Sequence, residues 1–576
     1  MIIKPQFDKT GVLSEYPRPQ KQRESYINLN GEWLYAFRLD EQFCKDFDGT
    51  IVVPYSPESE FSTVKRQLDK NQFLHLKKIF TLPKGFNQGR VILNVGACDQ
   101  TCKVYLNGKL LHENFDGYTA FSVELTNILD GENVLYMVVK DDADSDVYGR
   151  GKQKYKRGGI WYTATSGIWQ SVFLESVPVD YIKDFKYYID FDNKILTVKL
   201  STTNTQKPVY MSIIDQNEVI SASGFDKIEV DISTLKTWSP ESPELYGVVF
   251  SYDKDRVKSY FGVRKFSKIK VGDRWYFAIN NKPVFLNGLL DQGYYFGGIY
   301  TPKTNEDMFK EILSLKNMGF NMLRKHIKIE PMLWYYYCDV LGMVVFQDMI
   351  NGGAPYNPLR IMLCPFFNLR INDHNYKAMG RANLQSRNQY KYEANRLIAQ
   401  LFNVTSLFLY TPFNEAWGQF DAVENYNELL KLDSTRLFDH ASGWQDMGVS
   451  DVNSKHIYFR KLKLKNDGKR VLCLTEFGGY AYLVKGHTTS KKKFGYKFCK
   501  TREKFQQALQ DLYLNQVIPM IKKQGLGSTC YTQVSDVEDE INGLYTYDRM
   551  LKVDPKFIKD INEKVQQAFF DMIGKN

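Results

Sequence analysis

The sequence predicts a multidomain protein: an N-terminal jelly-roll β-sandwich, an Ig-like β-sandwich and a C-terminal TIM (β/α)8 barrel. Three observations support this fold class. The chain has 576 residues, which is too long for one ordinary core. Short strand-like segments separated by turn residues fill its first half. From about residue 268, buried strand-like runs alternate with segments of helical spacing, as they do in a barrel of β/α units.

Residues 1–178 are predicted to form the jelly roll, a sugar-binding-like domain. Residues 90–97 and 102–106 have strand-like composition, and the second is followed by Asn107-Gly108, a strong hairpin signal. Residues 179–267 are predicted to form the Ig-like sandwich. This segment is close to the length of one small sandwich and contains strand-like runs at 195–200 and 209–214.

Residues 268–576 are predicted to form the TIM barrel. Thr304 with Asp307 resembles a capping box that begins a helix, and Gly342 is expected to end the next helix. The predicted barrel strands are 284–287, 320–325, 343–347, 406–411, 436–441, 454–458, 471–475 and 528–532. Helices are expected between most of them, and the last is expected near 555–572.

Two apolar runs in this half each end in a glutamate. Residues 407–414 lead to Glu415, and residues 471–475 lead to Glu476. Apolar runs without polar alternation are typical of strands inside a parallel sheet. Because side chains at the C-terminal ends of barrel strands form the active site, two carboxylates there suggest cleavage of a glycosidic bond.

Composition excludes several other classes. The formal charge of +10 is too dilute over this length to indicate a nucleic-acid partner. No apolar run is long enough for a membrane span, and the N-terminus lacks the apolar core of a signal peptide. The eight cysteines form no Cys-x-x-Cys pair, so we expect reduced thiols and a cytoplasmic protein.

Several motifs occur in a fixed order along the chain. They are Asn30-Gly31-Glu32-Trp33, Val104-Tyr105-Leu106-Asn107-Gly108, Ser166-Gly167-Ile168-Trp169-Gln170, Phe261-Gly262-Val263-Arg264 with Asn287-Gly288, Asn414-Glu415 and Thr475-Glu476-Phe477-Gly478. Together they resemble glycoside hydrolase family 2, the family of β-galactosidases, β-glucuronidases and β-mannosidases. The resemblance covers nearly the whole chain, although the family's extra C-terminal β domains are missing.

The resemblance implies that Glu415 is the acid/base and Glu476 the nucleophile of a retaining glycosidase. The two carboxyl groups should then lie about 5–5.5 Å apart. The alternative is that each glutamate merely caps the loop or helix that follows it. Asn414 is expected to bind the sugar 2-hydroxyl. Arg324 is expected to hold Glu476 ionised, with a salt bridge at the barrel rim as the alternative.

The remaining candidates for substrate binding each have a structural alternative. His326 resembles a sugar-contacting histidine of the β-galactosidases, and a hydrogen-bonded structural histidine is the alternative. Asp291 and Asp348 follow strands one and three, where each either binds sugar hydroxyls or caps a helix. Trp444, Asp451 and His456 fall around strands five and six, Tyr458 either hydrogen-bonds the nucleophile or fills the core, and Tyr531 is expected to form a stacking platform.

Two features bear on the sugar and on cofactors. Basic residues follow Glu476 and form either a solvated loop or a rim that attracts acidic glycans. They are Lys485, Lys491, Lys492, Lys493, Lys497, Lys500, Arg502 and Lys504. Family β-glucuronidases carry an Asn-x-Lys that grips the substrate carboxylate, whereas this chain has Asn542-Gly543-Leu544. Residues 348–353 lack the Glu and His that bind magnesium in some β-galactosidases, so no metal or other cofactor is expected.

We therefore expect a retaining exo-β-glycosidase with a carbohydrate substrate, an oligosaccharide or glycoconjugate, and β-galactosidase is the first candidate. β-Glucuronidase and β-mannosidase are the alternatives within the family. A non-catalytic glycan-binding protein on a degenerate barrel is the alternative of another class. The sequence does not fix the oligomeric state, so a homo-oligomer is left open.

Overall fold

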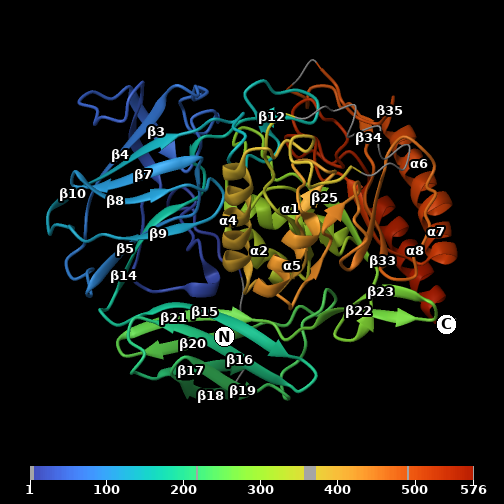
Figure 1. The fold of residues 1–576 in the computed structure, drawn as a ribbon, viewed down its shortest axis with the longest axis horizontal. Coiled ribbons are helices and arrows are strands. Elements are labelled where there is room, and N and C mark those ends of the chain that lie inside the picture. The colour runs from blue at the N-terminus through green and yellow to red at the C-terminus, as the bar shows by residue number, and fades with distance from the viewer. Residues whose placement is uncertain (1–4, 216–217, 356–370, 490–491, 575–576) are drawn as a thin grey trace.

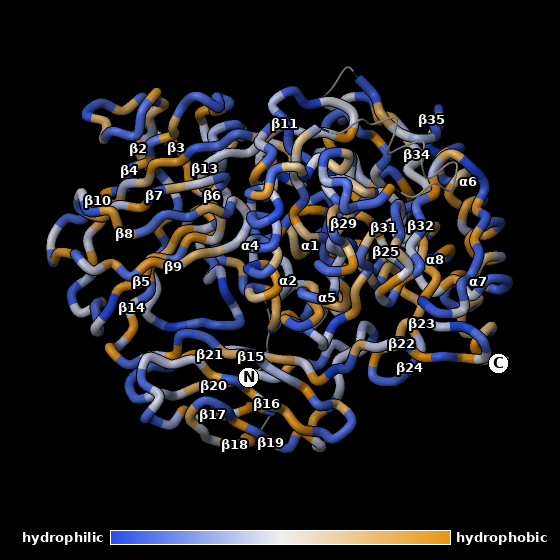
Figure 2. The backbone as a smooth tube through the Cα atoms, in the orientation of Figure 1, coloured by the Kyte–Doolittle hydropathy of each residue, from blue (hydrophilic) through white to orange (hydrophobic). Residues whose placement is uncertain are grey.

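The computed structural model describes residues 5–215, 218–355, 371–489 and 492–574. Figure 1 shows a blue β-sandwich beside an orange and red α/β barrel, with a green sandwich packed below both. In Figure 2 hydrophobic residues concentrate in the strands of the three parts, and hydrophilic residues dominate the surrounding loops. These observations agree with the predicted fold class.

The N-terminal sandwich is built from two main antiparallel sheets with the orders β1-β14-β5-β9 and β3-β2-β4-β10-β7-β8. Between them lie buried side chains such as Trp33, Leu76, Val104 and Leu174. The elements are η1 (Pro19–Lys21), β1 (Tyr26–Asn28), β2 (Gly31–Arg38), β3 (Gly49–Val53), β4 (Phe73–Thr81), β5 (Arg90–Val95), β6 (Cys98–Asp99), β7 (Thr101–Leu106), β8 (Lys109–Asn114), β9 (Phe121–Glu124), β10 (Glu132–Lys140), β11 (Gln153–Lys154), β12 (Tyr162–Thr163), β13 (Gly167–Ile168) and β14 (Val172–Val177).

The second sandwich has the sheets β15-β16-β19 and β18-β17-β20-β21, packed around a core that includes Phe185 and Phe250. Its strands are β15 (Ile182–Asp190), β16 (Ile195–Thr202), β17 (Val209–Asp215), β18 (Glu218–Gly224), β19 (Lys227–Asp231), β20 (Tyr246–Tyr252) and β21 (Asp255–Phe261). The predicted boundary at 178/179 lies between β14 and β15, and the one at 267/268 falls inside β22. The division into three domains stays a prediction.

A small sheet lies under the N-terminal ends of the barrel strands. It consists of β22 (Phe266–Val271), β23 (Arg274–Ile279) and β24 (Lys282–Pro283). The ring of Phe277 packs edge-on against Phe346 and Phe408, with centroid distances of 5.9 and 5.1 Å. Because this apolar layer fills the N-terminal end, polar side chains that reach into the barrel gather at the opposite end.

Eight parallel strands form the barrel, in the order β30-β28-β27-β26-β25-β36-β33-β32. They are β25 (Leu286–Asp291), β26 (Met322–Lys325), β27 (Val344–Asp348), β28 (Leu407–Thr411), β30 (Leu437–Phe438), β32 (Val452–Ile457), β33 (Val471–Gly478) and β36 (Leu526–Thr532). Every predicted barrel strand overlaps one of these. The ring closes between β30 and β32, where the amide of Asp451 donates to the carbonyl of Phe438 at 3.1 Å.

Helices lie around this sheet (Figure 1). They are α1 (Asn305–Asn317), α2 (Met332–Leu341), α4 (Leu384–Leu401), α5 (Ala422–Leu432), α6 (Arg502–Leu512), η2 (Tyr513–Val517), α7 (Ile518–Gln524) and α8 (Pro555–Ile573). The predicted capping box at Thr304 and Asp307 is formed, and Gly342 ends α2 with a left-handed backbone, φ 69°. Short strands after the barrel strands are β29 (Phe413–Asn414), β31 (Ala441–Ser442), β34 (Tyr480–Tyr482) and β35 (Lys497–Cys499).

Two further observations concern the chain as a whole. Within the described ranges, none of the helices is both long and apolar enough to cross a membrane. The cysteines in those ranges are all free thiols.

Candidate active site

The two glutamates of the apolar runs lie at the same end of the barrel. All five residues of β28 and all eight of β33 are buried, which explains their continuous apolar sequence. Glu476 lies within β33, and Glu415 follows β29 with a left-handed backbone, φ 50°. The amide of Glu415 donates to the carbonyl of Ser442 at 2.9 Å, which fixes this turn to the neighbouring strand.

His456 lies between the two carboxyl groups. Its Nδ1 is 2.7 Å from Oε1 of Glu415 and 3.7 Å from Oε1 of Glu476. One carboxylate oxygen of each glutamate and one ring nitrogen all lie within 4.8 Å of one another. That spacing suits a retaining pair, since inverting enzymes separate their carboxyl groups by about 6.5–9.5 Å.

A chain of hydroxyl groups assigns the tautomer of His456. Its Nε2 is 3.0 Å from Oγ of Ser442, and that hydroxyl donates to Oγ1 of Thr475 at 3.1 Å. Nε2 must therefore carry a proton and donate to Ser442. Nδ1 then shares one proton with Glu415: the imidazolium form donates it to the carboxylate, and the neutral ring accepts it from the carboxyl group. Gly443 makes room for the ring, because a Cβ there would lie 2.4 Å from it.

Arg324 at the end of β26 holds four partners from different strands. Its guanidinium donates to Asp348 at 2.9 Å, to the carbonyl of Thr475 at 3.0 Å, to Glu476 at 3.1 Å and to Oδ1 of Asn414 at 2.8 Å. This is the arrangement expected of Arg324, and it also orients the Asn414 amide.

Glu476 is ionised although it is buried. Burial alone would raise the pKa of Glu476, but the charges of His456 and Arg324 outweigh it and lower that pKa to about 2. The hydroxyl of Tyr458 also donates to Glu476, and its ring stacks on Tyr496 with centroids 3.9 Å apart. Tyr458 therefore contacts the predicted nucleophile, as the first of its two alternatives requires.

His326 and Asp348 form a buried pair beside this group. Burial, followed by the charge of Lys152, lowers the pKa of His326 to about 4, so the ring is neutral at ordinary pH. Its Nδ1 then donates to Asp348 at 2.6 Å, and Nε2 becomes an acceptor. Nε2 is buried and has no hydrogen-bond partner among the described residues, so a sugar hydroxyl could donate to it. Asp348 caps no helix, because Arg324 and His326 occupy its carboxylate.

Two predicted substrate contacts, Asp291 and Tyr531, are occupied by other groups. Asp291 accepts from Lys325 at 2.6 Å and from the amide of Gly293 at 2.8 Å, so neither sugar nor helix uses its carboxylate. Tyr531 is only 1% exposed, and its hydroxyl accepts from the amide of Tyr480 at 3.1 Å. The expected stacking platform is therefore a core side chain.

Asp451 lies at the wrong end of the barrel. It precedes β32, and its carboxylate accepts from the amide of Phe438 at 3.0 Å and pairs with Lys268 of β22 at 3.0 Å. Sequence position alone placed it near strands five and six, but the N-terminal end of a strand faces away from the site. Trp444 is partly buried and packs with Met379 and Ala416, next to Glu415.

Sequence reasoning missed the part that the N-terminal sandwich contributes. Trp161, from the loop before β12, meets Trp417 edge-on with centroids 5.0 Å apart. Trp417 lies two residues after Glu415. The sequence signal was the cluster of basic residues and glycines at 150–159, which sets this segment apart from the strands around it.

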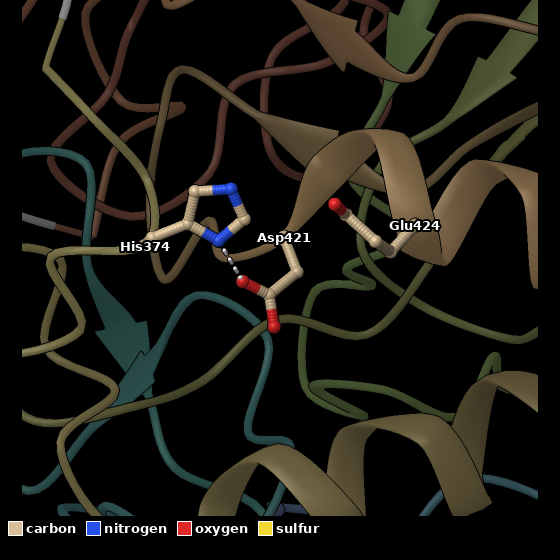
Figure 3. Close-up of side chains that lie close together, drawn as sticks. All are labelled: His374, Asp421 and Glu424. Atoms are coloured by element: carbon tan, nitrogen blue, oxygen red, sulfur yellow. Dashed lines mark hydrogen bonds and ion pairs between the residues drawn. The ribbon is translucent and has the colours of Figure 1, made fainter.

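Among the residues that the structure describes, two groups of side chains have donors suited to a metal ion. One is Glu415, His456 and Glu476 itself, and the other is His374, Asp421 and Glu424 at the surface. Figure 3 shows the second group: His374 hydrogen-bonds Asp421 at 2.7 Å, and Glu424 lies on α5 nearby. Tyr376 also donates to Asp421, at 3.0 Å, so this cluster ties the segment before α4 to the start of α5.

The basic run after Glu476 is described only in part. Lys491 lies outside the described residues, as do positions 356–370 of the loop after β27. Lys497 is exposed and places its ammonium 4.8 Å from the ring centroid of Tyr480. A role in attracting acidic glycans stays a hypothesis.

Comparison with known proteins gives one family match and several distant relatives. The family model "Glycosyl hydrolases family 2" matches residues 181–264. A β-galactosidase of Thermoanaerobacter pseudethanolicus is 22% identical over 492 residues, covering 80% of this chain and 62% of that protein. A β-galactosidase of Priestia megaterium is 24% identical over 510 residues, covering 76% of this chain and 46% of that protein.

Residues 181–264 thus match the family 2 model, and the chain is similar to a protein named β-galactosidase over 80% of its length. The chain spans about half to three-fifths of the length of the two β-galactosidases. Solved structures of family 2 enzymes have the same fold over nearly the whole chain. A β-glucuronidase from an uncultured Clostridium sp. has a TM-score of 0.72 at 18% identity, covering 98% of this chain and 100% of that one. A β-galacturonidase from Eisenbergiella tayi, bound to galacturonate, has a TM-score of 0.72 at 16% identity, covering 96% and 99%.

Proposed function

We propose that this protein is a retaining exo-β-glycosidase of family 2 that hydrolyses a terminal β-linked sugar by double displacement. The observation that carries the proposal is the placement of Glu415 and Glu476 around His456, with reactive atoms within 4.8 Å of one another. Arg324 and Tyr458 keep one of the two carboxylates ionised and oriented, as a nucleophile requires.

In the first step, Oε of Glu476 attacks the anomeric carbon while Glu415 donates its proton to the glycosidic oxygen. The bond to the leaving group breaks, and a covalent glycosyl-enzyme forms. Glu415 is the more accessible of the two, since its side chain is 23% exposed and that of Glu476 is 5% exposed. An acid that must reach a departing aglycone and later a water molecule has to face the opening.

In the second step, Glu415 takes a proton from water, and the resulting hydroxide attacks the anomeric carbon and releases Glu476. The contact between His456 and Glu415 can hold this proton between the steps, because Nδ1 and the carboxyl group can share it. Asn414 is oriented by Arg324 to meet the sugar 2-hydroxyl, a contact that strengthens in the transition state.

We propose a β-galactoside as the first candidate substrate, supported by the relatives named β-galactosidase. A β-uronide is the second candidate. The fold neighbours named β-glucuronidase and β-galacturonidase favour it, since this chain spans their full length. The sequence Asn542-Gly543-Leu544, which lacks the lysine of family β-glucuronidases, argues against a glucuronidase of the usual kind.

A panel of nitrophenyl β-glycosides tests the proposal. The wild-type chain should turn over at least one of them, and Glu476→Gln should lose about 10⁴-fold or more in kcat, because the nucleophile is gone. Azide should restore part of the rate as an external nucleophile. Glu424→Gln is the matched control, since the same change at an exposed glutamate of α5 should leave kcat unaltered.

An unchanged rate in Glu476→Gln would remove this residue from the mechanism. Absence of turnover by the wild type on every glycoside, with binding of the same sugars retained, would instead favour a non-catalytic glycan-binding protein.

A further inference from the structure

A loop of the N-terminal sandwich forms one wall of the active site. The loop, residues 147–163, crosses from the sandwich to the C-terminal end of the barrel (Figure 1, teal, at β12). The amides of Arg150 and Gly151 both donate to the carbonyl of Asn351, at 3.1 and 3.2 Å. Further along the loop, Arg157 pairs with Glu538 at 3.1 Å, and the amide of Thr163 donates to the same carboxylate at 3.2 Å. The loop is therefore fixed at both of its ends to barrel loops.

Glycine at position 151 lets this loop approach the floor of the site. Its backbone is left-handed, φ +58°, and a Cβ there would lie 2.9 Å from the carbonyl oxygen of Ile327. Ile327 directly follows His326, the neutral histidine beside Asp348. The next residue of the loop, Lys152, is thus delivered next to His326, and its carbonyl accepts from the amide of Tyr162 at 2.9 Å.

The side chain of Lys152 forms no ion pair with a carboxylate of the described residues, although its charge reaches His326 and Glu476. The side chain is partly buried, and in the described ranges it makes no hydrogen bond or ion pair. The charge of Lys152 lowers the pKa values of His326 and Glu476. For His326 it is the largest cause after burial. For Glu476 it adds to the larger effects of His456 and Arg324.

Two carboxylates that contact this loop, Glu538 and Glu540, have partners other than Lys152. Glu538 accepts from Arg157 and from the amide of Thr163, at 3.1 and 3.2 Å. Glu540 accepts from the Tyr162 hydroxyl and from Asn542.

Two other buried cations of the site, Arg324 and Lys325, each form ion pairs with carboxylates, whereas Lys152 forms none within the described residues. Arg324 pairs with Asp348 and Glu476, and Lys325 pairs with Asp291 and Glu330. A partly buried ammonium without a partner bears a desolvation cost that an anionic ligand would offset.

We propose that Lys152 binds an anionic group of the terminal sugar, so that the order of the two candidate substrates reverses: an acidic β-glycoside, first of all a β-hexuronide, is preferred over the neutral β-galactoside. This inference rests on the proposed glycosidase function. A lysine ammonium is a compact point charge that can meet a carboxylate, sulfate or phosphate without the fixed geometry of arginine. In this chain the charge comes from the N-terminal sandwich, whereas the barrel segment Asn542-Gly543-Leu544 supplies none.

The test compares acidic and neutral substrates in matched variants. kcat/KM is measured for nitrophenyl β-galactoside, β-glucoside, β-galacturonide, β-glucuronide and the 6-phosphate and 6-sulfate of the galactoside. The variants are Lys152→Met, Lys152→Arg and Lys156→Met. Lys156 is an exposed residue of the same loop, so its change removes the same charge without removing the contact.

We expect the wild type to prefer one of the acidic substrates over its neutral counterpart. Lys152→Met should lower kcat/KM for that substrate by about 10- to 100-fold, the loss typical of a hydrogen bond to a charged group, and should change the neutral substrates by less than about threefold. Lys152→Arg should recover part of the loss, and Lys156→Met should behave as wild type. Which acidic substrate is preferred distinguishes a carboxylate from a phosphate or sulfate.

Two results would overturn the inference while leaving the glycosidase intact. One is a wild type that hydrolyses neutral glycosides and none of the acidic ones. The other is Lys152→Met lowering kcat/KM equally for neutral and acidic substrates, which would make Lys152 a hydroxyl contact or a structural residue. Failure of the wild type on all six substrates would refute the proposed function itself.

Discussion

Replacing Arg324 by methionine should cost both stability and activity. The guanidinium is the shared partner of two buried carboxylates, Asp348 and Glu476, and methionine keeps much of its apolar volume while removing the charge. Breaking a buried ion pair by removing one partner costs about 3–5 kcal/mol, because the remaining charge is left without compensation. We expect a loss of that size in the free energy of unfolding at neutral pH.

The pH dependence of stability gives a more specific signature. The pKa of Glu476 is about 2 in the folded protein against a reference value of 4.5. Because the folded pKa is the lower one, the stabilisation is complete above 4.5 and is lost as the pH falls toward 2. Between about pH 6 and about pH 3 the wild type should lose about 2 kcal/mol from this group. In Arg324→Met the pKa of Glu476 lies higher, so this part of the loss should shrink.

Denaturant unfolding followed by tryptophan fluorescence at the two pH values measures this difference, and kcat/KM against pH measures the catalytic effect. Arg264→Met is the control. Arg264 is also a buried arginine, but it donates to the carbonyl of Thr405 at 3.1 Å and pairs with no carboxylate among the described residues. It should lower stability without changing the acid dependence. An equal acid-induced loss in wild type and Arg324→Met would refute the electrostatic role given to Arg324.

Two further changes test other parts of the site. His456→Asn removes a charge that lowers the pKa of Glu476, so the acid limb of kcat/KM should move to higher pH, and kcat should fall by about 100-fold with the loss of the proton-holding contact to Glu415. An acid limb at the wild-type position would contradict this. Tyr531→Phe leaves the amide of Tyr480 without its acceptor, so the free energy of unfolding should drop by about 1–3 kcal/mol while KM stays constant. A raised KM with unchanged stability would restore the stacking role that the structure argues against.

The barrel could be predicted from the sequence because its strands are buried on both faces. Runs such as 407–411 and 471–475 have no polar alternation, and each is followed within four residues by a glutamate, Glu415 or Glu476. The helices between the strands could be predicted from their capping residues, such as Thr304 at the start of α1. Since the C-terminal ends of parallel strands meet at one end of a barrel, the proximity of Glu415 and Glu476 followed from the fold.

The partners of the polar side chains could not be predicted. Asp291 follows its strand at the expected end, yet Lys325 of the next strand takes its carboxylate, and no sequence pattern encodes that pairing. Tyr531 is buried because Gly478 lets its ring pack closely: a Cβ at that glycine would lie 2.4 Å from the ring. Asp451 was misplaced because a shift of a few residues in a strand boundary moves a side chain from one end of the barrel to the other.

The loop of residues 147–163 has a consequence for how this protein can be divided. Its contacts with Asn351, Trp417 and Glu538 make the N-terminal sandwich part of the active site. The barrel expressed alone would therefore lack one wall of that site. Exchanging the first sandwich between related chains would therefore also exchange this loop and the positive charge of Lys152. In a modular protein of this kind, sugar preference can change through a segment that contributes neither of the two reacting carboxylates.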